Sequence, residues 1–266
     1  MNRSELVNRI RSTKSFLCVG LDTDPDKLPA ALKGKKDAVL AFNKAIIDAT
    51  APYCVAYKIN TAFYEAYGVK GWEIMEATKA HIPATHFTIA DAKRGDIGNT
   101  SSQYAKAFFD TLGFDAVTVA PYMGADSVRP FLEHKNKWTI VLGLTSNSGA
   151  ADFELQKMGD ELLYEKVMRT VRSWGSPENL MFVVGATQAD SFVNIRRLLP
   201  DHFFLVPGVG AQGGSLSEIA QKARNKETGL LVNASRAVIF ASSGDDYVEA
   251  AALAAKNYQI EMSSFI

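Results

Sequence analysis

Short apolar or β-branched runs alternate with helix-like segments along the whole chain. Eight runs have the length and composition of buried strands, at residues 16–22, 53–59, 86–91, 115–120, 138–144, 180–185, 203–207 and 229–234. Between them, apolar residues recur at helical spacing in segments such as 37–50, 100–112 and 215–224. This alternation is typical of repeated βαβ units with a parallel sheet, and near-continuous apolar strands indicate a sheet that is covered on both faces.

Eight such units predict an α/β fold of the closed (β/α)8 or TIM-barrel type. The 266 residues are predicted to form one domain (1–266), because single barrels have about 250 residues. An open doubly wound sheet is the alternative for the same pattern. The longest polar connection, residues 145–160, follows the fifth run and would lie on the catalytic face of a barrel.

The charge balance and the termini narrow the class of protein. Acidic and basic residues number 29 each, which argues against a nucleic-acid or membrane partner but permits a local basic pocket. The charged N-terminus lacks the apolar core of a signal peptide, and no apolar run approaches the ~20 residues of a membrane span. Cys18 and Cys54 lie within apolar runs, as expected for buried thiols in a reducing compartment. We therefore expect a cytoplasmic protein.

The densest group of charged residues follows the third run. Asp91 and Lys93 are two residues apart, so an extended backbone would point both toward the barrel mouth, and Gly95 would let the chain turn sharply before Asp96. Lys58 ends the second run and adds a second ammonium group. Alternating charges offset each other's desolvation, so a lysine can remain a cation beside a developing carbanion and then deliver a proton. The alternative is a salt-bridge network that only ties strand ends together.

A second group of residues is suited to binding phosphate. Residues 207–214 read PGVGAQGG after the seventh run, and such a glycine-rich turn lets backbone N–H groups converge on an anion. Arg236 follows the eighth run at the start of a predicted short helix, the position where barrels often bind phosphate. Gln212, Ser146 and Asp22 also follow strands and could bind polar groups of a ligand. A tight loop without a ligand is the alternative.

Several other kinds of site are not indicated. The four histidines, His81, His86, His134 and His202, lack metal-ligand spacing, so we predict no metal site. The chain has neither a G-x-S-x-G elbow nor a dinucleotide fingerprint, and we predict no cofactor.

One segment carries a resemblance to a known family. DAKRGDIGNT, at residues 91–100, resembles the signature of the orotidine 5′-phosphate decarboxylase family. The supporting motifs are GLD at 20–22, YKIN at 57–60, GLTSN at 143–147, VPGVGAQGG at 206–214 and NASR at 233–236. Of these, VPGVGAQGG and NASR are most similar to the longer-chain bacterial (type 2) subfamily.

The resemblance implies decarboxylation of orotidine 5′-phosphate to UMP, the last step of de novo pyrimidine nucleotide synthesis, without a cofactor. Lys93 would protonate C6 of the pyrimidine as carbon dioxide leaves. Asp91 would lie beside the substrate carboxylate and hold Lys93. Lys58 would link these charges to the ribose hydroxyls, together with Asp22.

The resemblance also implies a homodimer with shared active sites. Three residues of one chain would complete the site of the other: Asp96, Ile97 and Thr100. Ser146 would contact the pyrimidine. The phosphate would be held by Gln212, by backbone amides near Gly213 and by Arg236.

Two rival functions remain open from the sequence. A sugar-phosphate decarboxylase or hexulose-phosphate synthase of the same superfamily would share D-x-K-x-x-D but use magnesium. The I-G-N-T continuation and the lack of a further acidic ligand set favour the metal-free nucleotide enzyme. A non-catalytic phosphate-binding barrel would bind UMP but release no carbon dioxide from orotidine 5′-phosphate.

Overall fold

Eight parallel strands form a closed barrel in the computed structural model, which describes residues 1–188, 190–210 and 214–266. Each barrel strand pairs with the barrel strand that follows it in the chain, and β10 pairs with β1 to close the sheet. The predicted (β/α)8 barrel is therefore confirmed, and closure excludes the open sheet. The barrel strands are β1 (Leu17–Gly20), β2 (Ala56–Asn60), β3 (Phe87–Arg94), β4 (Ala116–Val119), β5 (Trp138–Leu144), β8 (Leu180–Val184), β9 (Phe203–Pro207) and β10 (Leu230–Ala234).

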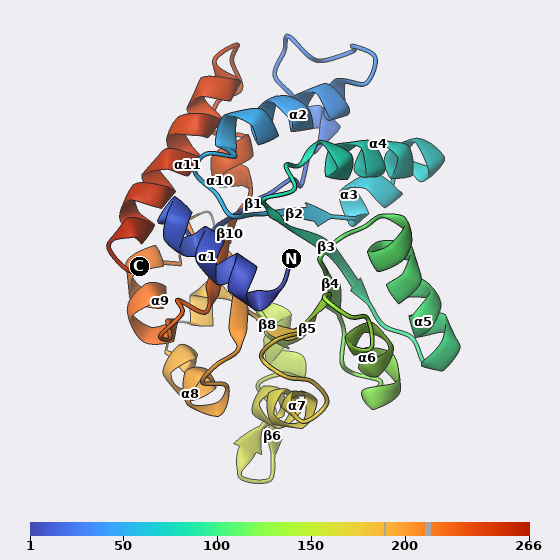
Figure 1. Ribbon diagram of the computed structural model, residues 1–266, viewed down its shortest axis with the longest axis vertical. Coiled ribbons are helices and arrows are strands. Elements are labelled where there is room, and N and C mark those ends of the chain that lie inside the picture. The colour runs from blue at the N-terminus through green and yellow to red at the C-terminus, as the bar shows by residue number, and fades with distance from the viewer. Residues whose placement is uncertain (189, 211–213) are drawn as a thin grey trace.

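Helices surround the barrel on the outside, as Figure 1 shows. The predicted helices at 37–50 and 215–224 correspond to α2 and α9, whereas the segment 100–112 is divided between α5 and a π-helix, η2 (Ala107–Thr111). The helices are α1 (Arg3–Thr13), α2 (Ala38–Thr50), α3 (Ala62–Glu65), α4 (Gly68–His81), α5 (Gly98–Lys106), α6 (Ala125–Leu132), α7 (Leu163–Arg172), α8 (Ser191–Leu198), α9 (Leu216–Ala223), α10 (Arg236–Ile239) and α11 (Tyr247–Ser263).

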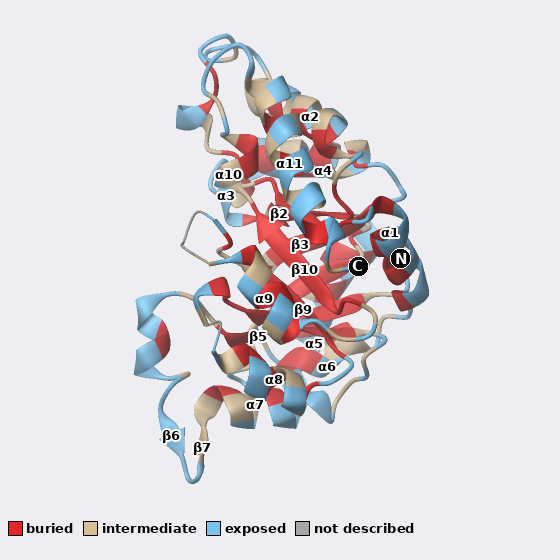
Figure 2. Cartoon of the chain, turned by 90° about the vertical axis from the view of Figure 1, so that its left-hand side faces the viewer, coloured by how far each residue is buried: buried red, intermediate tan, exposed pale blue. Residues whose placement is uncertain are grey.

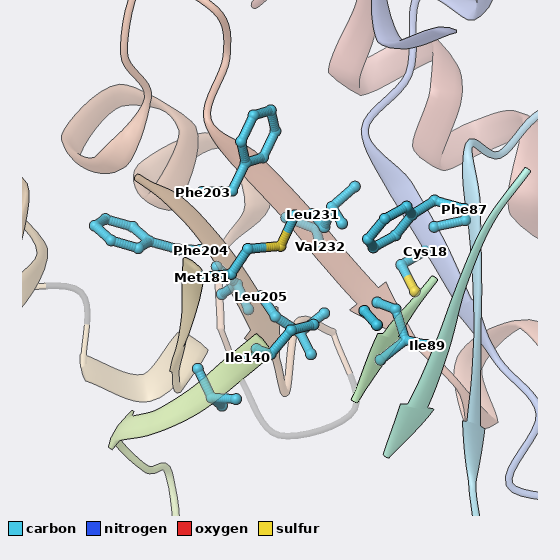
Figure 3. Packing of buried hydrophobic residues seen from close by; sticks show 14 of the residues in the cluster. Cys18, Phe87, Ile89, Ile140, Met181, Phe203, Phe204, Leu205, Leu231 and Val232 are labelled. Atoms are coloured by element: carbon cyan, nitrogen blue, oxygen red, sulfur yellow. The ribbon is translucent and has the colours of Figure 1, made fainter. Parts of the chain in front are cut away.

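The barrel interior changes from aromatic to charged along the strands. Near the strand starts, Trp138 makes edge contacts with Phe87 and Phe203, with ring centroids 6.0 and 6.3 Å apart. Figure 3 shows part of this core, with side chains from β1, β3, β5, β8, β9 and β10. Because alternate residues of a strand share a face, Asp91 follows Phe87 on the interior face of β3 at its C-terminal end. The apolar packing thus supports a charged layer at one end of the barrel.

Helix α1 covers the opposite, N-terminal end of the barrel (Figure 2). The ammonium group of Met1 bonds to Asp115, just before β4, at 2.6 Å, and the indole of Trp138 donates to the Met1 carbonyl at 3.0 Å. Arg3 donates to the carbonyl of Asp201, just before β9, at 2.6 Å. These contacts join the strand starts to the N-terminal segment.

The polar connection after β5 carries structure of its own. It contains a 3-10 turn, η3 (Ser148–Asp152), and a short antiparallel hairpin of β6 (Lys157–Met158) and β7 (Glu161–Leu162). The amide of Thr145 donates to Glu154 at 2.7 Å, which ties the base of the connection together. In Figure 2 the hairpin projects on the side opposite α1, consistent with its predicted place on the catalytic face.

Candidate active site

A cavity of about 220 Å³ lies at the C-terminal ends of the barrel strands. Residues from β1, β2, β3, β8, β9 and β10, or from the loops that follow these strands, contribute to its wall. The polar and charged lining residues are Asp22, Lys58, Asn60, Asp91, Lys93, Asn233, Ser235 and Arg236. The structure therefore brings together five of the predicted site residues: Asp22, Lys58, Asp91, Lys93 and Arg236.

Two lysines and two aspartates form a connected array in this cavity. Lys58 is 3% exposed, and its Nζ donates to Asp91 Oδ2 at 2.9 Å and to Asp22 Oδ1 at 3.3 Å. Lys93 donates from Nζ to the other oxygen of Asp91, Oδ1, at 2.7 Å. The side chain of Lys93 is half exposed, so its ammonium group can meet a ligand in the cavity while Asp91 holds it.

The array keeps both buried groups charged. Burial by itself favours the neutral acid of Asp91, but the ammonium groups of Lys58 and Lys93 outweigh it and hold the pKa of Asp91 well below its usual range. Burial likewise opposes the charged form of Lys58, but Asp91 and Asp22 more than offset it and raise the pKa of Lys58 above its usual value. The cavity therefore presents fixed charges in a site where desolvation would otherwise neutralise them.

The backbone at Lys93 differs from the extended conformation that the sequence predicted. Its φ is +46°, in the left-handed region, and the pairing of β3 with β4 shifts register between Ala90 and Arg94. Asp91 and Lys93 both face the barrel mouth as expected, but the extended backbone predicted at Lys93 is wrong, and the two side chains meet because of this bulge. The sharp turn expected at Gly95 is not found: residues 95–97 form no turn or bend, and the nearby glycine with positive φ is Gly98, at +49°.

Asp96 does not join the array within its own chain. Its carboxylate accepts the backbone N–H of Ile97 at 2.8 Å, next to the start of α5. The second carboxylate beside the two lysines is that of Asp22. Ile97 is a large apolar side chain with 56% of its surface exposed, and Thr100, also exposed, lies in the first turn of α5. These residues do not belong to the described lining of the cavity.

The predicted phosphate end is formed by the segments after β9 and β10. Arg236 is the first residue of α10, as predicted, and faces the same cavity as Gly208 and Val209. Gly208 has a φ of +96°, a conformation that favours glycine in the turn after β9. The two other predicted phosphate contacts, Gln212 and Gly213, lie outside the described residues.

Ser146 follows β5 and is half-buried. It lies against the chain just after β8, where a Cβ added to Gly185 would come within 2.6 Å of the Ser146 amide nitrogen. Ser146 is not among the described residues that line the cavity.

Four polar residues of the site were not among the predicted site residues: Asn60, Asn233 and Ser235, which line the cavity, and Thr118, which bonds to Asp91. Asn233 on β10 lines the cavity and is 6% exposed, and its Oδ1 has no hydrogen-bond partner among the residues described. An amide inside the apolar run LLVNA was a signal that could have identified it. Thr118 on β4 is fully buried and bonds to Asp91 Oδ1 at 2.9 Å. A threonine in an apolar strand is an ordinary β-former, so the sequence carried no signal for it.

Metal ligands, thiols and membrane-spanning helices would indicate other kinds of site. Across residues 1–188, 190–210 and 214–266, no three or more histidine, cysteine, aspartate or glutamate side chains gather as metal ligands. Cys18 and Cys54 are free and buried, and burial raises the pKa of both thiols. Among the helices described, none has the length and apolar character needed to cross a membrane.

The chain matches known proteins over nearly its whole length. The family model described as "Orotidine 5'-phosphate decarboxylase / HUMPS family" matches residues 15–253. The orotidine 5′-phosphate decarboxylase of Christiangramia forsetii is 57% identical over 267 residues, covering 99% of this chain and 98% of that protein. The enzyme of the same name from Phocaeicola vulgatus is 53% identical, covering 100% of this chain and 99% of the relative.

Solved structures agree with these matches. A structure of Leishmania donovani OMP decarboxylase superposes with a TM-score of 0.86 at 35% identity, covering 100% of this chain and 99% of that one. Leishmania donovani UMP synthase superposes with a TM-score of 0.88 at 36% identity, covering 100% of this chain and 56% of the larger protein. Family and fold are thus supported by independent comparisons.

Proposed function

Because the chain belongs to the orotidine 5′-phosphate decarboxylase family and converts orotidine 5′-phosphate to UMP in pyrimidine synthesis, we propose that Lys93 is the proton donor. Breaking the bond between C6 and the substrate carboxylate releases carbon dioxide and leaves the electron pair on C6. The ammonium group of Lys93 stabilises that charge and transfers a proton to C6. The neutral amine then regains a proton from solvent. The observation that carries this proposal is the 2.7 Å bond that holds the half-exposed Lys93 ammonium against the buried Asp91.

Asp91 has two proposed roles. It fixes the position of Lys93, and its permanent negative charge faces the carboxylate that the substrate loses. The low pKa of Asp91, which the two lysines maintain against burial, supports a carboxylate that stays ionised throughout turnover. Two like charges held close together favour departure of the substrate carboxylate as neutral carbon dioxide.

The remaining contacts position the nucleotide. We propose that Lys58 and Asp22 bind the ribose hydroxyls, since their 3.3 Å pair lies in the same cavity as Lys93. Arg236 binds the phosphate, because a guanidinium at the cavity wall can make paired charge-assisted bonds to it. Ser146 is assigned to the pyrimidine. Gln212 and the backbone near Gly213 are assigned to the phosphate by sequence alone.

The active unit is proposed to be a cytoplasmic homodimer of one-domain chains, with active sites shared between subunits and no cofactor or metal. Asp96, Ile97 and Thr100 would enter the partner's site and add a carboxylate to its charged array. The exposure of the apolar Ile97 and the position of Asp96 outside its own array support this arrangement.

The proposal is tested by the fall in ultraviolet absorbance when orotidine 5′-phosphate is converted to UMP, with EDTA present. Native protein is expected to turn over under these conditions, and a requirement for added magnesium would contradict the metal-free reaction. Lys93→Ala should abolish measurable turnover yet still bind UMP in calorimetry. Near-normal turnover by Lys93→Ala would refute Lys93 as the proton donor.

A further inference from the structure

Thr118 joins the two central charged residues through a single hydroxyl. It lies on β4 next to the C-terminal part of β3 and is fully buried. Its Oγ1 accepts the backbone N–H of Lys93 at 2.9 Å and donates to Asp91 Oδ1, also at 2.9 Å. That same carboxylate oxygen accepts the ammonium group of Lys93 at 2.7 Å. Three hydrogen bonds thus join Lys93, Thr118 and Asp91 in a ring that the Lys93 side chain closes.

The bulge in β3 explains why a hydroxyl is needed there. From Ala90 to Arg94 the chain of β3 advances four residues, while its partners on β4, Val117 and Val119, are only two apart. Thr118 lies between Val117 and Val119 on β4 and therefore faces the extra residues of the β3 bulge. The Lys93 N–H bonds to the Thr118 hydroxyl rather than to a carbonyl of the neighbouring strand. A buried N–H without a partner is costly, so the hydroxyl stabilises the bulged backbone.

The ring also sets the direction of the proton on Thr118. A hydroxyl has one proton to donate, and the Lys93 N–H can only donate. Oγ1 must therefore accept from Lys93 and send its own proton to Asp91. Asp91 Oδ1 then has two donors, and the carboxylate is fixed in rotation as well as in charge. Left-handed backbone at a non-glycine residue persists only where surrounding contacts enforce it, and Thr118 supplies one such contact at Lys93.

We propose that Thr118 is a positioning residue for the decarboxylation, which aligns the Lys93 ammonium by holding both the Lys93 backbone and the Asp91 carboxylate. It acts through these two groups and is not itself assigned a contact with the substrate. The inference rests on the proposed role of Lys93 as proton donor. Loss of the hydroxyl would let the ammonium move relative to C6 while the ribose and phosphate contacts stay in place.

The chain offers a closely matched control for this idea. Thr139 on the next strand, β5, is also fully buried, and its Oγ1 has no partner within the described ranges. Thr118→Val and Thr139→Val therefore make the same chemical change on adjacent strands, but only the first removes bonds to the site. Thr118→Ser keeps the hydroxyl and loses a methyl group, so it separates hydrogen bonding from packing.

Steady-state kinetics with orotidine 5′-phosphate test the proposal. Thr118→Val is expected to lower kcat by roughly 10- to 100-fold, the cost of a slight misplacement of a catalytic group, with KM changed by less than about threefold. Thr118→Ser should recover kcat to within about threefold of native, and Thr139→Val should match native in both constants. If Thr118→Val does not fold, Thr118→Cys takes its place under the same criteria, because a thiol of similar size hydrogen-bonds only weakly.

Three results would overturn the inference: native kcat in the folded Thr118→Val or Thr118→Cys protein, equal losses in the Thr118 and Thr139 variants, or no recovery in Thr118→Ser. Lys93→Ala, measured beside them, separates this inference from the proposed function. Turnover lost in Lys93→Ala but retained without the Thr118 hydroxyl contradicts only the role of Thr118. Turnover retained in Lys93→Ala contradicts the proton-donor assignment itself.

Discussion

Mild acid is expected to destabilise the protein through His202, a buried imidazole just before β9. Its side chain is 2% exposed, and neither ring nitrogen has a hydrogen-bond partner in the described part of the chain. Burial, reinforced by the guanidinium groups of Arg172, Arg3 and Arg196, lowers the pKa of His202 to about 4, with Asp201 opposing the shift. The folded protein therefore keeps this residue neutral in a range where a free histidine is protonated.

The sign and size of the effect follow from this shift. The unfolded chain, with an ordinary histidine pKa of about 6.5, binds a proton between about pH 6.5 and pH 4 that the folded chain does not. The full stability is therefore present above that range and is lost as the pH falls through it. The shift corresponds to about 3 kcal/mol in all, of which about 2 kcal/mol is lost between pH 7 and pH 4.5.

Urea unfolding at pH 7 and at pH 4.5 measures this contribution directly. His202→Leu should remove it, so the variant should lose about 2 kcal/mol less than native protein over the same pH change. His81→Gln controls for the loss of an imidazole as such, because the His81 side chain is partly exposed whereas that of His202 is buried. The same acid loss in His202→Leu as in native protein would refute the reasoning.

Three further predictions concern the active site. Lys58→Met should lower the free energy of unfolding by about 3 kcal/mol, because it removes one of the two ammonium partners of the buried Asp91 and the ion pair of Asp22, and should also reduce turnover; urea unfolding with native-like stability would contradict this. Arg236→Ala should raise KM for orotidine 5′-phosphate by roughly 100-fold with little change in kcat, and an unchanged KM in steady-state assays would remove its phosphate assignment. Mixed Lys93→Ala and Asp96→Ala subunits should recover about a quarter of native activity after full exchange, through one intact site per heterodimer; no recovery with exchange confirmed would argue against shared sites.

The barrel could be predicted from the sequence because its strands are covered on both faces. Runs such as 180–185 and 203–207 are apolar at almost every position, and their regular alternation with helical segments allows few other folds. Arg236 was equally accessible to prediction, since a strand end followed by a short helix is a recurrent phosphate position in barrels. These features depend on local pattern, which a sequence displays directly.

The details of the charged array depend on geometry that no local pattern encodes. Lys93 was expected in extended backbone, whereas a bulge of β3 against β4 places it in the left-handed region. Asp22 rather than Asp96 provides the second carboxylate within the chain, because the closure of the barrel sets which strand ends lie together. The role of Thr118 can be recognised only once β3 and β4 are paired, because it depends on the bonds of Thr118 to Lys93 and Asp91 on the neighbouring strand.

The most direct test of the account is exchange of the C6 hydrogen of UMP in deuterated water. If Lys93 protonates C6 in the forward reaction, the same residue must remove that proton in reverse, and NMR can follow the exchange without decarboxylation. Native protein should exchange the C6 hydrogen, while Lys93→Ala should bind UMP and leave it in place. Exchange at the native rate in Lys93→Ala would contradict the central role given to this lysine.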